Sequence, residues 1–461
     1  MPGNPPRDEF LLRLGEAQAR LDAGFARLPP SPPPVLGESA AAILSQVAER
    51  MHDNYPYAHP LYAGQMLKPP HPIARAAYAL AMSVNPNNHA LDGGRASSAM
   101  EVEAVAALAR MFGWPRHLGH LSSGGTFANL EALWVAGQLH PARAIAASGQ
   151  AHYTHARISA VLGLPFVSIP TDDSGRMDLD ALEHALKSQD VGTVVATLGA
   201  TATGAVDPLD SVLELRARYG FRIHVDAAYG GYFMLAGNLG PETRAAFDAI
   251  AGVDSLVVDP HKHGLQPYGC GCILFRDPAV GRFYKHDSPY TYFTSKNSSE
   301  LHLGEISLEC SRAGASAVAL WATQRLLPYL PGGEFARGLE AGRSAALEIR
   351  RRLAADLRVV LPVAPPALDI LVWAPRGKSP AESSARSRAI FDQALRSDLY
   401  LALADLPARF FPPATWPQDE THPQADPIVT CLRSVLMKPE HLPWVEQIWL
   451  RLDAATTAVL A

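Results

Sequence analysis

The sequence predicts an α/β protein with a mostly parallel central sheet, helices on both faces and a smaller C-terminal α+β domain. From about residue 100 to residue 330, short apolar runs typical of buried strands alternate with stretches of helical periodicity. This alternation is typical of a parallel sheet that helices cover on both sides. A proline- and glycine-containing break at 328–333 separates this region from the remaining residues. The chain of 461 residues is long enough for both units.

The N-terminal elements are expected to lie outside the main core. Residues 8–28 carry apolar side chains at helical spacing, a proline-rich link follows at 29–34, and a second helix is predicted at 40–51. The arm has little core of its own, so we expect it to pack on a second subunit. The predicted division is an arm and linker at 1–60, a large domain at 61–333 and a small domain at 334–461.

Each element of the large domain is predicted from its own pattern. The predicted helices cover residues 100–112, 126–137, 155–162 and 209–219, with one more around Trp321. The predicted strands lie near Ala144 and at 166–169, 193–198, 222–225, 255–258 and 272–275. In open α/β sheets ligands lie beyond the carboxyl ends of the strands, so the residues that follow these strands are the candidates for a site.

Composition excludes several classes of protein. Apolar residues make up 48% and charged residues 18%, as in a well-buried globular enzyme. The net charge of −5 gives no reason to expect a nucleic acid or an anionic membrane as partner. Without an apolar run of about 18 residues or a signal-peptide pattern, we expect a cytoplasmic protein and no membrane span. Cys270 and Cys272 are too closely spaced for a zinc clamp, so no metal is expected.

Two polar positions after neighbouring apolar runs point to chemistry. The strand predicted at 222–225 leads to Asp226, and the strand at 255–258 leads to a turn that contains Lys262. A pyridoxal phosphate (PLP) enzyme needs a lysine that holds the cofactor as a Schiff base and a carboxylate that keeps the pyridine nitrogen protonated. Either residue alone is weak evidence, but the pair in this order is strong. The sequence therefore predicts PLP as the cofactor.

Three further segments are candidates for the same site. Gly125 and Thr126 belong to a glycine-rich turn that opens a helix, which suits a phosphate, although a plain capped loop is the alternative. His152 stands at a strand-to-helix junction, where it could stack on the cofactor ring or cap the helix. His155, one helical turn later, is expected to face solvent or to support the site from behind. Thr201 follows another strand and could donate to the cofactor or the substrate, or cap the turn.

The chain resembles the group II PLP-dependent amino-acid decarboxylases over residues 55–330. The motifs that carry the resemblance lie at 59–66, 85–88, 123–126, 151–152, 224–231 and 259–262. Among these enzymes it is most similar to bacterial tyrosine decarboxylases and archaeal tyrosine/aspartate decarboxylases, which share its Asp-Pro-His-Lys turn. The resemblance implies PLP-dependent transferase fold type I, which is aspartate-aminotransferase-like. It also implies a homodimer with sites at the subunit interface, and the conversion of an L-amino acid into an amine and CO2.

The resemblance implies roles for single residues as well. Lys262 would hold the cofactor, Asp226 would pair with the ring nitrogen, and Ala228 and His152 would lie against the two ring faces. Tyr292 would be the acid that protonates the substrate carbon, in a loop that closes over the neighbouring subunit's site. Tyr268 is the alternative acid. The other implied cofactor contacts are Gly125, Thr126, Thr201, Asp259 and His261, and the implied substrate contacts are His59, Tyr62, Asn88 and Arg312.

Departures from the family pattern leave the substrate open. Phe127 replaces the usual glutamate after the glycine turn, His263 alters the lysine turn, and the C-terminal region is shorter than in the bacterial tyrosine enzymes. Aromatic residues near the expected site slightly favour a tyrosine-like substrate over aspartate or glutamate. Another reaction of the same fold stays possible, such as an aldehyde synthase, a carbon–carbon lyase or an aminotransferase. A non-enzymatic PLP-binding protein is disfavoured because the whole catalytic set is present.

Overall fold

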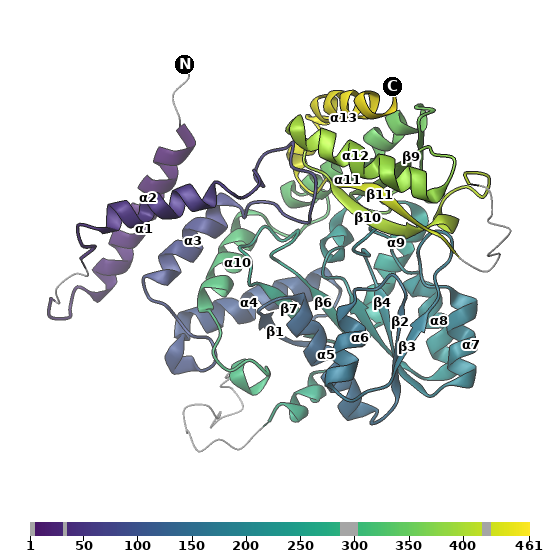
Figure 1. Ribbon diagram of the computed structural model, residues 1–461. Helices are drawn as coiled ribbons and strands as arrows, with labels where there is room; N and C mark the ends of the chain where they lie inside the picture. The colour runs from purple at the N-terminus through teal and green to yellow at the C-terminus, as the bar shows by residue number, and fades with distance from the viewer. Residues whose placement is uncertain (1–4, 31–34, 286–302, 417–425) are drawn as a thin grey trace.

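A seven-stranded sheet forms the centre of the computed structural model, which describes residues 5–30, 35–285, 303–416 and 426–461 (Figure 1). The strand order is β1-β7-β6-β5-β4-β2-β3. The strands from β6 to β3 pair in parallel, whereas β7 pairs antiparallel with both β1 and β6. The predicted α/β class with a mostly parallel sheet is confirmed. The strands are β1 (Leu118–Ser122), β2 (Ala144–Ser148), β3 (Phe166–Ile169), β4 (Val191–Thr197), β5 (Arg222–Asp226), β6 (Ser255–Val258) and β7 (Gly271–Phe275).

Helices cover both faces of this sheet, which is why its inner strands are buried and mostly apolar. Every residue of β2, β4, β6 and β7 is buried. The predicted bounds of β3, of β6 and of the helix at 209–219 agree with the structure, whereas β1 was expected only as a lead into the glycine turn. The helices of this region are α4 (Arg95–Met111), α5 (Gly125–Leu139), α6 (Thr154–Val161), α7 (Leu179–Ser188), α8 (Leu209–Tyr219), α9 (Pro241–Asp248) and α10 (Gly314–Leu326).

A second, antiparallel sheet with strand order β10-β11-β9-β8 follows α11, as expected for a C-terminal α+β unit. Leu368, just before β9, and Ile370, the first residue of β9, share a buried core with Tyr229 and Phe233 of the first region. The exact domain division stays a prediction. The elements are α11 (Glu334–Ala354), β8 (Val359–Val360), β9 (Ile370–Pro375), α12 (Pro380–Arg396), β10 (Ala402–Pro407), β11 (Ile428–Val435) and α13 (Val445–Leu460).

The first two helices project from the rest of the molecule (Figure 1). They are α1 (Pro5–Phe25) and α2 (Ala40–Met51), and α1 packs on α3 (Pro72–Met82). No side chain of α2 is buried, and its apolar residues Ile43, Leu44 and Val47 are exposed. Within the described part of the chain, none of the helices combines the length and apolar character that crossing a bilayer requires.

Candidate active site

A cavity of about 420 Å³ opens where polar residues follow β2, β4, β5 and β6. This edge is where open α/β sheets generally bind ligands. All of the predicted cofactor-binding residues line the cavity, so the structure brings them together from separate segments of the chain. They are Gly125, Thr126, His152, Thr201, Asp226, Ala228, Asp259, His261 and Lys262.

Asp226 is the buried carboxylate of the cavity. Its Oδ2 lies 2.9 Å from Nε2 of His155 and accepts a hydrogen bond from Asn129 Nδ2 at 3.3 Å, while its Oδ1 accepts from the backbone N–H of Ala228 at 3.1 Å. Burial alone would raise the pKa of Asp226, but the contact with His155 and the charges of His155 and Lys262 outweigh it and hold the pKa well below its usual range. The site therefore contains a carboxylate that stays anionic at neutral pH.

Lys262 lies on the turn after β6, on the same side of the sheet as Asp226. Its Nζ lies 3.2 Å from Oδ2 of Asp259, and its backbone N–H donates to the Asp259 carbonyl at 2.9 Å. The turn is fixed at its other side because the N–H of His261 donates to the carbonyl of Cys270 at 3.1 Å. The lysine amine is thus held at the cavity by a carboxylate from its own turn.

The start of α5 forms one wall of the cavity. Gly124, with φ of +157°, precedes the helix, and no side chain caps the first turn. A Cβ on Gly125 would come within 2.7 Å of Asp259 Oδ2, so glycine is required for this close approach. Free amides at a helix start, with the positive end of the helix dipole, favour an anion such as a phosphate. Phe127, the departure from the family pattern, also lines the cavity.

His152 and Thr201 belong to two different loops that line the cavity. Nδ1 of His152 lies 2.8 Å from Thr154 Oγ1, and the imidazole stacks on the Tyr153 ring with centroids 4.4 Å apart. Burial lowers the pKa of His152, which favours the neutral ring at physiological pH. The Thr201 carbonyl accepts from Nη2 of Arg433 at 2.6 Å, so this loop is tied to β11.

These residues fit PLP on three separate counts. The uncapped helix start suits the phosphate, Lys262 provides the amine, and Asp226 provides the anion for a ring nitrogen. In addition, Nδ1 of His261 and Oδ1 of Asp259 are buried at the cavity without a hydrogen-bond partner among the described residues. Buried polar atoms are normally paired, so these two atoms indicate a missing polar ligand.

Three buried residues behind Asp226 were not selected as site residues from the sequence. The His155 side chain is only 1% exposed and faces Asp226. Of the two positions expected for it, facing solvent or supporting the site from behind, the structure shows the second. Asn129 donates from Nδ2 to Asp226 and accepts at Oδ1 from Nε2 of His224 at 2.8 Å. Nδ1 of His224 in turn lies 2.9 Å from Ser255 Oγ. His224 stands two residues before Asp226 on the same strand face, which is the signal that could have identified it.

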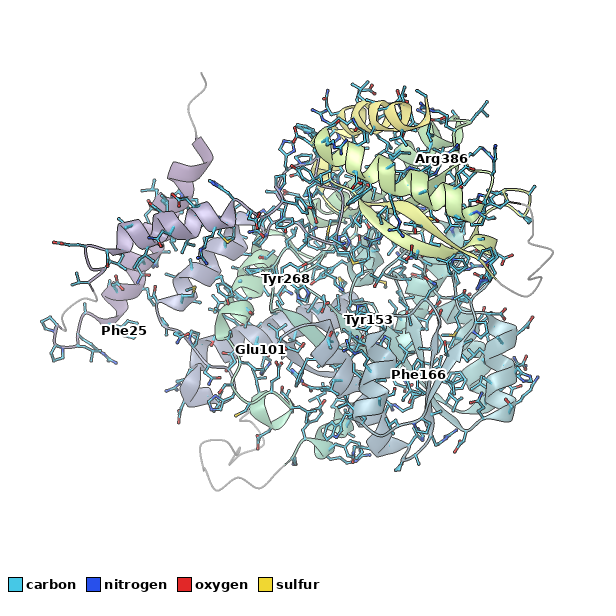
Figure 2. All side chains as sticks on the ribbon, viewed as in Figure 1. Phe25, Glu101, Tyr153, Phe166, Tyr268 and Arg386 are labelled. Carbon is cyan, nitrogen blue, oxygen red and sulfur yellow. The ribbon has the colours of Figure 1, made fainter. Side chains whose placement is uncertain are left out.

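The remaining predicted residues of the N-terminal region and the lysine turn lie outside the cavity lining. His59 packs edgewise on Trp444 with ring centroids 5.0 Å apart, and Tyr62 is buried among other tyrosines. Tyr268, which Figure 2 labels near the centre of the molecule, donates from its hydroxyl to the Met66 carbonyl at 3.0 Å. Its ring lies against His261, with centroids 4.7 Å apart, so it borders the cavity residues.

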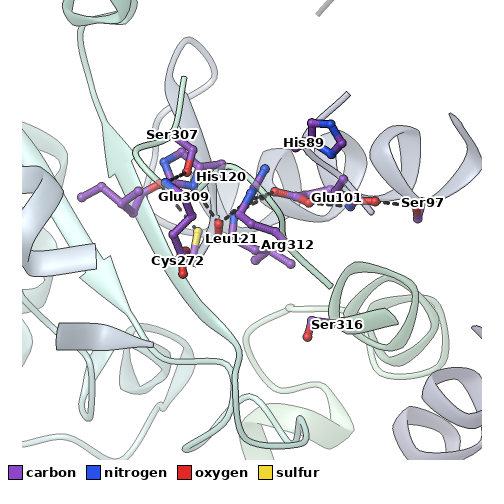
Figure 3. A network of polar contacts seen from close by, with 12 residues as sticks. His89, Ser97, Glu101, His120, Leu121, Cys272, Ser307, Glu309, Arg312 and Ser316 are labelled. Atoms are coloured by element: carbon purple, nitrogen blue, oxygen red, sulfur yellow. Dashed lines mark hydrogen bonds and ion pairs between the residues drawn. The ribbon is translucent and has the colours of Figure 1, made fainter. Parts of the chain in front are cut away.

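Asn88 and Arg312 belong to a buried polar network around Glu101 (Figure 3). Glu101 Oε2 accepts from Asn88 Nδ2 at 2.6 Å, and Glu101 Oε1 accepts from Arg312 Nη1 at 2.8 Å and from the Leu121 N–H at 3.0 Å. Arg312 Nη1 also donates to the Leu121 carbonyl. Within the described chain, Nε and Nη2 of Arg312 are buried without a hydrogen-bond partner. The network holds the segment before α10 against β1.

Two further predictions concern Tyr292 and metals. Tyr292 lies outside the described residues. In the described ranges no cluster of histidine, cysteine, aspartate or glutamate has the arrangement of a metal site.

Comparison with known proteins identifies relatives of the whole large region. The family model described as pyridoxal-dependent decarboxylase conserved domain matches residues 30–329, more than half of the chain. An L-tyrosine decarboxylase from Enterococcus faecium is 28% identical over 385 residues, which cover 62% of this chain and 63% of that enzyme. A probable L-tyrosine/L-aspartate decarboxylase from Methanothermobacter thermautotrophicus is 31% identical over 265 residues, 57% of this chain and 70% of that protein. The match to the Enterococcus enzyme thus spans less than two thirds of its length.

Solved structures share the fold. The crystal structure of Oryza sativa TDC with PLP and tryptamine matches with a TM-score of 0.78 at 19% identity and covers 100% of both chains. Mouse CSAD in its apo form matches with a TM-score of 0.75 at 21% identity, over 95% of this chain and 92% of that chain. The predicted PLP-dependent transferase fold type I is therefore confirmed.

Proposed function

The chain belongs to the family of pyridoxal-dependent decarboxylases, with PLP as its cofactor, and from this premise we propose that it converts an L-amino acid into the corresponding amine and CO2. The observation that carries the proposal is the convergence of Lys262, Asp226 and the uncapped start of α5 on one cavity. A lysine, an anionic carboxylate and an anion cradle are the groups that this chemistry requires.

Each cavity residue has a proposed task. When bound, PLP supplies a protonated pyridine ring that accepts the electron pair released as CO2 leaves the substrate. Asp226 keeps the ring nitrogen protonated, because its own carboxylate is held anionic. Lys262 attaches the cofactor, and Asp259 orients the lysine amine. The proposed phosphate ligands are Gly125, Thr126 and His261.

Two side chains fix the plane of the ring in this proposal. His152 stacks on one face, as a largely uncharged imidazole, and Ala228 packs on the other. Both line the cavity, and a small side chain at Ala228 leaves room for a flat ring. Thr201 donates from its hydroxyl to the cofactor or to the substrate.

The acid that protonates the substrate carbon is proposed to be Tyr292, on the basis of the family resemblance. Tyr268 is the alternative, and its support is its position against His261 at the cavity. Its hydroxyl is bound to the Met66 carbonyl, so Tyr268 would have to break that hydrogen bond to act.

The proposed substrate is an aromatic, tyrosine-like amino acid, favoured slightly over aspartate or glutamate. The relatives include tyrosine, tyrosine/aspartate, aspartate and 2,4-diaminobutyrate decarboxylases, so they support an amino-acid substrate without selecting one. The proposed substrate contacts remain His59, Tyr62, Asn88 and Arg312. Nε and Nη2 of Arg312 are buried without a hydrogen-bond partner among the described residues, and Arg312 does not line the cavity.

We further propose a cytoplasmic homodimer with sites at the subunit interface. The projecting helices support it, since Leu11, Leu12, Ile43, Leu44 and Val47 are exposed apolar residues that a second subunit would bury. Mixing inactive Lys262→Ala subunits with inactive Tyr292→Phe subunits tests the shared site. Recovered activity after subunit exchange supports it, and none after confirmed exchange contradicts it.

The function itself is tested by incubating the purified protein with PLP and each of the twenty amino acids. Release of CO2 together with the amine supports decarboxylation. Aldehyde, ammonia and peroxide would instead support the aldehyde synthase, and a keto acid would support an aminotransferase. A protein that binds PLP but consumes none of the amino acids would contradict the proposed activity.

A further inference from the structure

A buried polar cluster lies directly behind the lysine turn. Tyr229 donates from its hydroxyl to Asp369 Oδ1 at 2.6 Å, and Nε2 of His263 lies 3.4 Å from Asp369 Oδ2. Asp369 is fully buried, and His263 and Tyr229 are nearly so. The cluster joins distant parts of the chain: Tyr229 follows β5, His263 follows Lys262, and Asp369 immediately precedes β9 of the second sheet.

Two members of the cluster touch the candidate active site. Tyr229 lines the cavity, and His263 is the residue after Lys262. The His263 ring packs edgewise on Tyr229, with centroids 4.7 Å apart, and on Phe233 at 5.1 Å. The backbone of Asp369 is held in place within the C-terminal unit, because its carbonyl accepts a hydrogen bond from the Leu436 N–H at 2.9 Å. One carboxylate from the C-terminal unit thus contacts both a wall of the cavity and the back of the lysine turn.

The polar atoms of the cluster are incompletely paired. Oδ2 of Asp369 and both ring nitrogens of His263 are buried without a hydrogen bond among the described residues. Burial raises the pKa of Asp369 to about 6, against the opposing effects of the Tyr229 hydroxyl and the charges of Lys68 and Arg433. A well-packed apolar residue is often at least as stabilising as a buried charge, so fold stability alone does not explain a carboxylate here.

We propose that Asp369 is a positioning residue that ties the C-terminal unit to the cofactor cavity, holding the Tyr229 ring in the cavity wall and His263 behind Lys262. This role goes beyond decarboxylation, because it concerns how the protein binds its cofactor. Since Asp369 acts as an anion, its protonation should loosen the cavity wall. The charged and titratable groups that act on Asp369 or on its neighbours are Tyr229, His263, Lys68, Lys262, Arg433, Lys438 and Glu440.

The experiment measures PLP affinity of the cofactor-free protein by quenching of its tryptophan fluorescence. Asp369→Asn keeps the size of the side chain and removes its charge, and Tyr229→Phe removes only the hydroxyl. Loss of a hydrogen bond to a charged group corresponds to about a tenfold change in binding affinity. Each variant should therefore bind PLP about tenfold more weakly than wild type at pH 8. Both changes disrupt the same hydrogen bond between Tyr229 and Asp369. The double variant should therefore bind PLP no more weakly than either single variant. Asp392→Asn, exposed on α12, is the matched control and should bind as wild type does.

The pH dependence separates positioning from a general structural effect. The difference in PLP affinity between wild type and Asp369→Asn should be largest at pH 8 and should shrink towards pH 5. At that pH the Asp369 carboxyl is protonated and, like the asparagine amide, carries no charge. Comparing the two proteins cancels the titration of PLP and of other residues. Additive effects of the two changes, a difference that does not vary with pH, or unchanged PLP affinity in folded variants would overturn the proposal. None of these measurements depends on catalytic activity, so the proposed reaction can fail while this role stands.

Discussion

Asp226 and Asp369 are both buried carboxylates close to the lysine turn, yet their ionisation is shifted in opposite directions. The pKa of Asp226 is held well below its usual range, whereas that of Asp369 is raised to about 6. Burial opposes the charge in both cases. The difference lies in the partners, because His155 contacts Asp226 at 2.9 Å and Lys262 adds its charge, while the close partner of Asp369 is the neutral Tyr229 hydroxyl.

The comparison shows how one small region can hold two carboxylates for different tasks. An anion that must stay charged under a cofactor ring needs basic groups within contact distance. A carboxylate that links two parts of the fold needs only a hydrogen-bond donor, and it can take up a proton near pH 6. Changing the partners should therefore alter the two sites in different and measurable ways.

The largest effect is expected when the lysine whose charge acts on Asp226 is removed. Lys262→Ala should abolish turnover and covalent attachment of PLP while leaving the protein folded, because the other cavity residues remain. Borohydride reduction followed by mass spectrometry of the peptides measures the attachment. Lys285→Ala, which changes an exposed lysine, is the control and should keep the adduct. A cofactor adduct that persists in Lys262→Ala would contradict the assignment.

Asp226→Asn should still bind PLP but lose turnover by about 10²-fold or more, since a neutral amide cannot keep the ring nitrogen protonated. Steady-state kinetics with the preferred amino acid measures the loss, and a PLP titration measures the retained binding. Asp173→Asn, an exposed position, should behave as wild type. Near-normal turnover in Asp226→Asn would mean that another group controls the ring nitrogen.

His155→Leu tests whether the partner makes Asp226 an anion. Without the histidine, burial should raise the pKa of Asp226, so turnover should fall about tenfold and the acid limb of its pH profile should move to higher pH. His155→Gln, which can still donate a hydrogen bond, should recover part of the loss. The exposed His184→Leu serves as control. An unchanged acid limb would show that the other partners of Asp226, and not His155, set its ionisation.

The sequence predicted the elements whose ends are marked by turn residues, such as β6 and α8, and missed β1 as a strand. β1 contains Gly119 and His120 and is short, so its pattern lacks a continuous apolar run. Its place in the sheet depends on antiparallel pairing with β7, more than 100 residues later in the chain, which local periodicity does not reveal.

In the candidate site, too, residues marked by local sequence were predicted and contacts between distant segments were not. Asp226 and Lys262 were selected because each follows a strand, and parallel strands bring such residues to one edge. The supporting contacts were beyond this reasoning. His155 meets Asp226 across 71 residues, and Tyr229 meets Asp369 across 140 residues of sequence. Only packing of the second sheet against the first determines the latter contact, and His263 was noticed solely as a departure from the family's lysine turn.

The smallest effect is expected in the free energy of unfolding. The contributions of the two carboxylates to it should change with pH in opposite directions. The folded pKa of Asp369 lies above the value of about 4 for an unfolded aspartate, so its contribution to stability is present below pH 4 and is lost as the pH rises through 6. Asp226 has a lowered pKa, so its contribution is present above pH 4 and is lost only as the pH falls further.

Urea unfolding of the cofactor-free protein between pH 4.5 and 7.5 therefore distinguishes the two carboxylates. Asp369→Asn should unfold with a flatter dependence on pH than wild type, because the amide does not titrate. Its net change near pH 7 should be small, since removing the buried charge also removes its attraction to Lys68. Asp226→Asn should leave the slope in this range unchanged, as Asp226 is ionised throughout. Parallel curves for wild type and Asp369→Asn would mean that Asp369 is not the group that titrates near pH 6, and that the contrast between the two carboxylates does not hold.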